Sequence, residues 1–113
     1  MRTIPTALIA AAIGFAGVAR ADDLPTASLT IGDKGCEPMR LAVRPGKTTF
    51  QVKNVSGRKI EWEILNGVNV VEERENIIPG FTVRVTAKLD AGEYLMTCGL
   101  LNNPKGALTV AAE

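Results

Sequence analysis

The chain has 113 residues, with 13 lysine and arginine residues against 12 aspartate and glutamate residues, and no histidine. A chain of this length builds one modest hydrophobic core. The formal net charge of +1 lacks the basic excess that nucleic-acid binding favours, and the absence of histidine excludes metal sites built on imidazole ligands.

The first residues have the pattern of an export signal. Arg2 supplies a positive start, residues 4–18 form an apolar run that is short for a membrane span, and the Ala-Arg-Ala at 19–21 fits a cleavage site. We therefore predict a signal peptide at 1–21, a mature domain at 22–113 and a periplasmic location, without stable membrane insertion after cleavage. Removing the two arginines of the signal leaves 11 basic against 12 acidic residues, a net charge of −1.

The mature chain alternates apolar and polar residues in short stretches, which is typical of half-buried strands. In chain order these stretches are 28–31, 39–44, 48–54, 60–64, 68–71, 81–85, 94–98 and 108–110. Turn-forming pairs separate them, among them Pro45-Gly46, Asn66-Gly67 and Pro79-Gly80. Short strands at this spacing, without a helical period anywhere, predict an all-β sandwich or a small barrel.

The segment 92–110 is predicted to form a strand, a loop and a last strand. Cys98 opens the loop, which closes on Lys-Gly before the last strand. This segment resembles the C-terminal hairpin of the cupredoxins, in which a cysteine, a histidine and a methionine bind copper. Leu101 stands at the histidine position and Pro104 at the methionine position. A blue-copper centre needs two imidazoles and a thiolate, so we expect no blue-copper spectrum.

Four segments make the resemblance more specific, namely 36–39, 61–65, 70–77 and 96–106. They resemble the cupredoxin-like domain of the EfeO-type periplasmic iron-uptake proteins and the free-standing periplasmic cupredoxins that work with ferrous-iron permeases. The EfeO type continues into a large helical domain, whereas this sequence stops at Glu113, so we expect the free-standing kind. The resemblance implies an antiparallel Greek-key sandwich, a copper or iron ion, and an iron permease or another periplasmic iron-uptake component as partner.

Cys36 and Cys98 are the two cysteines of the chain. Cys98 stands at the family's thiolate position, and in a cupredoxin frame the loop with Cys36 lies at the same end of the sandwich. In an oxidising compartment the pair forms a disulfide, worth roughly 2–4 kcal/mol to a small domain. Alternatively, two thiolates bind a soft metal such as Cu(I), or act as a redox-active dithiol. Met96 shares a strand face with Cys98, where it packs in the core or serves as a weak thioether ligand. The sequence leaves these interpretations open.

Glu61 falls near the position of the first cupredoxin histidine. A carboxylate there favours harder ions, iron included, and Glu63 shares its strand face. Burial of Ile60, Trp62 and Ile64 turns both glutamates outward, unless the strand end bends into the pole of the sandwich and brings Glu61 to the site.

The acidic run Glu72, Glu73 and Glu75 is a second candidate iron site. Carboxylate oxygens suit hard cations, although such a run is also typical of a solvated loop.

The leading hypothesis is a periplasmic metal-binding and electron-transfer module of an iron-uptake system. It would oxidise ferrous iron at a thiolate–carboxylate centre, or carry iron to a permease, without being an enzyme in the usual sense. The alternatives are a thiol oxidoreductase, which the absence of Cys-x-x-Cys disfavours, and a binding domain held by one disulfide.

Overall fold

The computed structural model describes residues 24–112, all of whose regular elements are strands. The strands are β1 (Thr26–Gly32), β2 (Gly35–Glu37), β3 (Arg40–Val43), β4 (Gly46–Asn54), β5 (Ile60–Asn66), β6 (Asn69–Ile77), β7 (Thr82–Leu89), β8 (Gly92–Met96) and β9 (Gly106–Val110). No helix in this part of the chain is long and apolar enough to cross a membrane. The predicted signal peptide lies outside the described residues.

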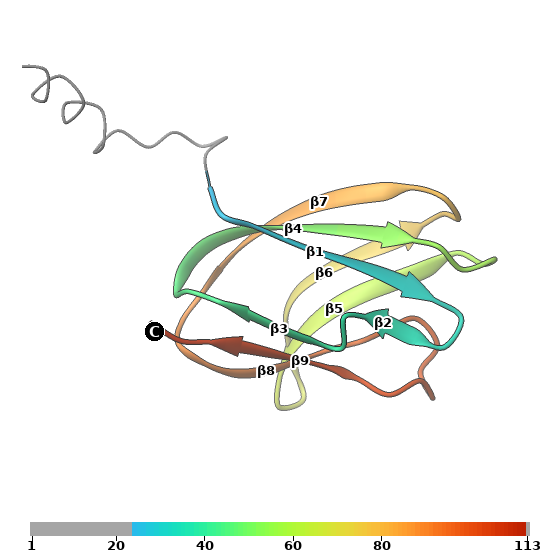
Figure 1. Cartoon of the computed structure of the whole chain (residues 1–113). Coiled ribbons are helices and arrows are strands. Elements are labelled where there is room, and N and C mark those ends of the chain that lie inside the picture. Colours follow the sequence, from blue (N-terminus) through green and yellow to red (C-terminus); the bar gives the residue numbers. More distant parts are fainter. Residues whose placement is uncertain (1–23, 113) are drawn as a thin grey trace, which may run out of the picture.

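The strands form two stacked sheets, a four-stranded sheet in the order β2-β1-β4-β7 and a five-stranded sheet in the order β3-β9-β8-β5-β6 (Figure 1). The prediction of an all-β sandwich is confirmed. Two pairs, β1 with β4 and β3 with β9, are parallel, so both sheets are mixed rather than purely antiparallel.

The core lies between the sheets because each strand alternates its side chains. Ile60, Trp62 and Ile64 of β5 point inward and are buried, and they meet Phe50 and Val52 of β4 from the opposite sheet. The rings of Phe50 and Trp62 pack with their centroids 5.4 Å apart and tilted by 47°. Burial of these side chains fixes the register of each strand, since a one-residue slip would turn every core side chain to solvent.

The charged run 72–76 belongs to β6 and not to a loop. The strand lies at the edge of the five-stranded sheet and pairs with β5 on one side. Solvent covers its free side, so a strand here tolerates charged side chains that an inner strand would not.

Candidate functional site

One end of the sandwich, which we call the loop pole, gathers the loops 33–34, 55–59, 78–81 and 97–105. It lies at the right in Figure 1, where β1 and β4 end. Asn103 ties two of these loops together, because its Nδ2 donates to the carbonyl oxygens of Cys98 at 2.8 Å and Asp33 at 3.3 Å.

A buried asparagine organises the loop between β4 and β5. Asn54 Nδ2 donates to the carbonyls of Arg58 at 2.8 Å and Ile77 at 2.9 Å. Its Oδ1 accepts from the backbone N–H of Ser56 at 2.8 Å and from Ser56 Oγ at 2.6 Å. These four bonds satisfy a side chain that is fully buried, so they hold the pole in one conformation.

The structure joins Cys36 of β2 to Cys98, which follows β8, in a disulfide with a Cα–Cα distance of 5.1 Å. Both residues are buried, at 4% and 1% exposure. Of the interpretations that the sequence left open, the covalent bond is the one that this structure contains. The bond ties the edge of the four-stranded sheet to the loop between β8 and β9.

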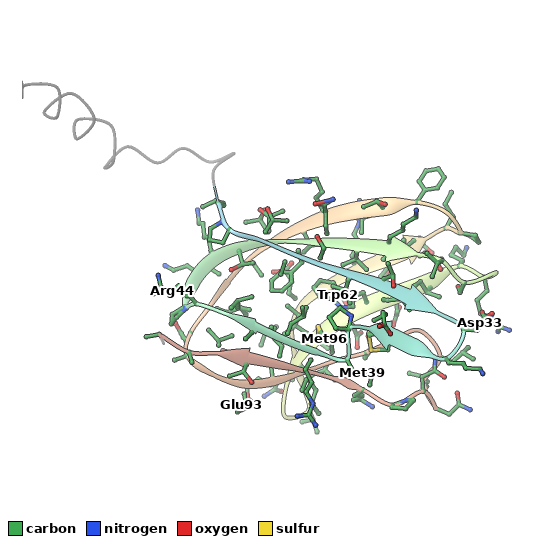
Figure 2. The ribbon with its side chains drawn as sticks, in the orientation of Figure 1. Asp33, Met39, Arg44, Trp62, Glu93 and Met96 are labelled. Carbon is green, nitrogen blue, oxygen red and sulfur yellow. A yellow bond between two sulfur atoms is a disulfide. The ribbon has the colours of Figure 1, made fainter. Side chains whose placement is uncertain are left out.

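Two methionines lie beside the disulfide. A Cβ added to Gly106 would come within 2.9 Å of Met96 Cε and 3.4 Å of Cys98 Sγ, and one added to Gly35 would lie 3.7 Å from Met39 Sδ. Figure 2 shows Met39 and Met96 in the same region as Trp62 and the yellow disulfide bond. Met96 is fully buried and Met39 half-buried. Sequence reasoning missed Met39, although the strand alternation from 39 onward already turned its side chain toward the core.

The residues of the pole do not fit a blue-copper ion. The chain has no histidine, and a sulfur in a disulfide is not a thiolate. Leu101, which the resemblance to cupredoxins assigns to the position of the loop histidine, is 87% exposed. Among residues 24–112, no three cysteine, aspartate or glutamate side chains converge in a way that would hold a metal ion.

The Glu61 side chain lies on the outward-facing side of β5, next to the loop pole. It lines an open hollow of about 350 Å³ with Leu100 and Leu101 of the loop that follows Cys98, and with Arg58 and Lys59. Glu61 itself is exposed, whereas the sulfurs are covered. The structure therefore brings Cys36, Cys98 and Met96 together inside the sandwich and places Glu61 and Glu63 on its outside.

Four carboxylates gather on the outer side of β5 and β6, and we call Glu61, Glu63, Glu73 and Glu75 the acidic face. Glu63 lies directly opposite Glu73 in the antiparallel pair. Glu61 flanks Glu63 along β5, and Glu75 flanks Glu73 along β6, each two positions away and so on the same side. Within the described residues, none of the four has a lysine or arginine in ion-pair contact.

Like charges perturb the centre of the acidic face. Partial burial first, and then the neighbouring carboxylates of Glu61, Glu73 and Glu75, raise the pKa of Glu63 above its usual value of 4.5. A hydrogen bond between the Glu63 and Glu73 carboxyl groups acts in the same direction. The surface therefore stores repulsion that a bound cation or proton relieves.

Two irregularities decide which glutamates share this face. The pairing of β5 with β6 shifts by one residue between Ile64 and Leu65 and again between Ile60 and Trp62. The first shift places Glu72 opposite the inward-facing Ile64, so Glu72 leaves the set of three that the sequence suggested. Asn76, with φ of 57°, lies at the second shift.

Comparisons with known proteins identify the family. The sequence model of the cupredoxin-like domain matches residues 5–110. The chain belongs to the cupredoxin-like family. It is 62% identical over 110 residues to the iron uptake system component EfeO of Yersinia pseudotuberculosis, covering 95% of this chain and 29% of that protein. The EfeO of Escherichia coli is 55% identical over 105 residues, covering 93% of this chain and 28% of that protein.

The chain spans under a third of the length of these curated relatives. Among solved structures, a reduced auracyanin of Roseiflexus castenholzii matches with a TM-score of 0.67 and 18% identity over 76% of this chain and 96% of that one. Auracyanin A of Chloroflexus aurantiacus, a blue copper protein, matches with a TM-score of 0.61 and 22% identity over 75% and 98%. At these identities the likeness shows the cupredoxin fold alone.

Proposed function

We propose that this chain is a periplasmic module of an iron-uptake system and that it collects iron ions on its acidic face. The observation that carries the proposal is the set Glu61, Glu63, Glu73 and Glu75, which share the outer side of β5 and β6 without an ion-paired lysine or arginine among the described residues. Partial burial and the neighbouring carboxylates raise the pKa of Glu63. The high identity to EfeO proteins over nearly the whole chain supports iron as the ion.

Carboxylate oxygens suit hard cations such as ferric iron, and Fe(II) also accepts them. Because no three of the described side chains converge on one point, the acidic face attracts and exchanges iron rather than enclosing it. A flat surface of this kind releases its cargo readily, as delivery to a permease requires. Glu61 lies where the acidic face meets the hollow of the loop pole, so it is the carboxylate that hands iron toward that end.

A second candidate function uses the sulfur side chains. Opening the Cys36–Cys98 bond takes two electrons and two protons and yields two thiols. A thiol reductant of the periplasm would supply both the electrons and the protons and would itself become a disulfide. The two thiolates with the Met96 thioether then offer a soft donor set, which suits Cu(I) and would support electron transfer. The close approach of Met96 and Cys98 around Gly106 favours this candidate, but it applies to the reduced protein only.

Iron titration tests the leading proposal. Ferrous iron under argon, and ferric iron presented as the citrate complex, are titrated into the parent and into a variant with Gln at 61, 63, 73 and 75. A matched control carries Asp33→Asn, Glu37→Gln, Asp90→Asn and Glu93→Gln, which removes the same number of negative charges elsewhere. We expect at least a tenfold loss of affinity in the acidic-face variant and a small loss in the control. Equal affinity in all three proteins would refute the assignment, and loss only in Cys36→Ser with Cys98→Ser would move the site to the sulfurs.

A further inference from the structure

The two outer surfaces of the sandwich carry opposite charges. On β4, Lys47 and Lys53 alternate with the buried Thr48, Phe50 and Val52, so both lysines point away from the core. On β7, Arg84 and Lys88 alternate in the same way with buried residues. We call Lys47, Lys53, Arg84 and Lys88 the basic face; all four are exposed, on the sheet opposite the acidic face.

Like charges stand side by side on both surfaces. Lys47 lies directly opposite Lys88 in the β4–β7 pair, as Glu63 lies opposite Glu73 in the β5–β6 pair. Directly opposed like charges weaken a sheet, and exchanging one charge of each pair would remove both repulsions without touching the core. The arrangement therefore does not stabilise the fold, but it leaves each surface with a strong charge of one sign.

Each surface acts on its surroundings separately. Stacked sheets lie about 10 Å apart, and the charged groups extend outward beyond them. The Debye length at physiological salt is about 8 Å, so the acidic face does not cancel the field of the basic face. The charges of the two faces cancel in the net charge of the chain, which is close to zero. The separation of charge becomes visible only when the outward-facing residues of β4 and β7 are told apart from the buried ones.

The rest of the basic face is hydrophilic. Its other outward positions on β1, β4 and β7 carry hydroxyl or amide side chains, apart from Gly32 at the end of β1; they are Thr26, Ser28, Thr30, Thr49, Gln51, Thr82 and Thr86. No large apolar side chain stands among them, whereas the buried centre of a protein–protein interface is apolar and aromatic. A surface of cations and hydroxyls fits a layer of phosphate groups better than a protein.

The basic face also contains a shallow hollow of about 280 Å³. Ser28, Thr30, Gln51, Lys53 and Thr82 line it, with the buried Leu29 beneath them and Glu37 at the edge strand. Hydroxyl, amide and ammonium groups are the donors that phosphate oxygens accept from. The single carboxylate opposes an anion, and it belongs to the edge strand β2.

We propose that the basic face docks the protein on an anionic phospholipid surface. The occupant is the phosphate headgroup layer of a membrane leaflet, which holds cations near its surface by its negative potential. Because the acidic face is repelled by the same layer, the protein lies with β4 and β7 toward the lipid and with the acidic face toward solvent. Docking keeps the iron-collecting surface free beside the membrane, but it does not depend on iron binding.

Vesicle co-sedimentation tests the proposal with the full chain. The vesicles are phosphatidylcholine alone, or phosphatidylcholine with phosphatidylglycerol at roughly three to one, at about 0.05 and 0.15 M salt. The basic-face variant carries Gln in place of Lys47, Lys53, Arg84 and Lys88. The control carries Gln in place of Lys34, Arg58, Lys59 and Lys105, the same change in net charge. Any contribution of the apolar N-terminal run is common to all three proteins.

We expect the parent to bind the anionic vesicles at least tenfold more tightly than the neutral ones, with binding weakened by salt. The basic-face variant should lose at least tenfold in vesicle affinity, since each cation near an anionic leaflet contributes about fivefold. The control should stay within about threefold of the parent, because its four cations lie away from the lipid. Equal losses in the two variants would overturn the proposal, because net charge alone would then explain binding. So would binding that ignores phosphatidylglycerol, or complete competition by millimolar inorganic phosphate, which would indicate a site for the free anion.

Discussion

Reducing the Cys36–Cys98 disulfide should remove a large part of the stability of this domain. The bond joins residues 62 apart in sequence, and for a loop of that length the chain-entropy relation gives about 4 kcal/mol at 25 °C. A domain of this size has a free energy of unfolding on the order of 5–15 kcal/mol. The reduced protein is therefore expected to be marginally stable.

Urea unfolding followed by the fluorescence of the single tryptophan, Trp62, measures this effect. The oxidised parent, the reduced parent and a Cys36→Ala/Cys98→Ala variant are compared. The reduced parent keeps both sulfur atoms and isolates the effect of the bond, whereas the variant adds a packing loss on the order of 1 kcal/mol at two buried positions. The slope of the transition should also rise without the bond, because the unfolded chain is then less compact.

A difference below about 1 kcal/mol between oxidised and reduced parent would refute the reasoning. It would mean that strain in the folded state, or residual structure in the unfolded state, offsets the constraint. In that case the bond would not be structural, and a redox role for the pair would gain support.

Three further predictions follow from single features of the structure. Asn54→Ala should lower the free energy of unfolding by roughly 2–4 kcal/mol, measured in urea, because it removes the buried amide that donates to the carbonyls of Arg58 and Ile77 and accepts from the backbone N–H of Ser56. The folded state binds the Glu63 proton more tightly than the unfolded state does. The free energy of unfolding therefore falls as the pH rises from 4.5 through the raised pKa of Glu63. Glu63→Gln should therefore raise Tm at about pH 7 and leave it unchanged at about pH 3.5; an equal shift at both would contradict the raised pKa. Cu(II) added to the reduced protein should give no intense blue-copper absorption, and such a band would show that the pole builds the centre without histidine.

The β-sandwich could be predicted from the sequence because the apolar core residues recur at every second position along the strands. Ile60, Trp62 and Ile64 of β5 alternate with charged residues, and β7 and β9 likewise alternate buried and more exposed positions. The edge strand β6 departs from this pattern, since all its residues except the half-buried Glu72 and the buried Ile77 are exposed and show no apolar alternation.

The members of the acidic face could not be predicted from the sequence, because they depend on the register between β5 and β6. From the Asn66-Gly67 turn, a regular hairpin would place Glu63 opposite Glu72, but the shift beside Ile64 moves Glu73 into that position. Each bulge moves the register by one residue and exchanges the two sides of the strand. The sequence therefore supplied the carboxylates, and the bulges selected which of them meet.

The location of bound iron tests the central proposal most directly. Amide spectra of isotope-labelled protein are recorded while paramagnetic iron is added in small steps, so that signals near the ion broaden first. We expect the earliest broadening at Glu61, Glu63, Glu73 and Glu75, where the carboxylates of β5 and β6 share one surface. The acidic-face variant should lose that pattern and the charge-matched control should keep it. Broadening centred on Cys98 and Met96, with β6 unaffected, would contradict the proposal and place the metal inside the loop pole.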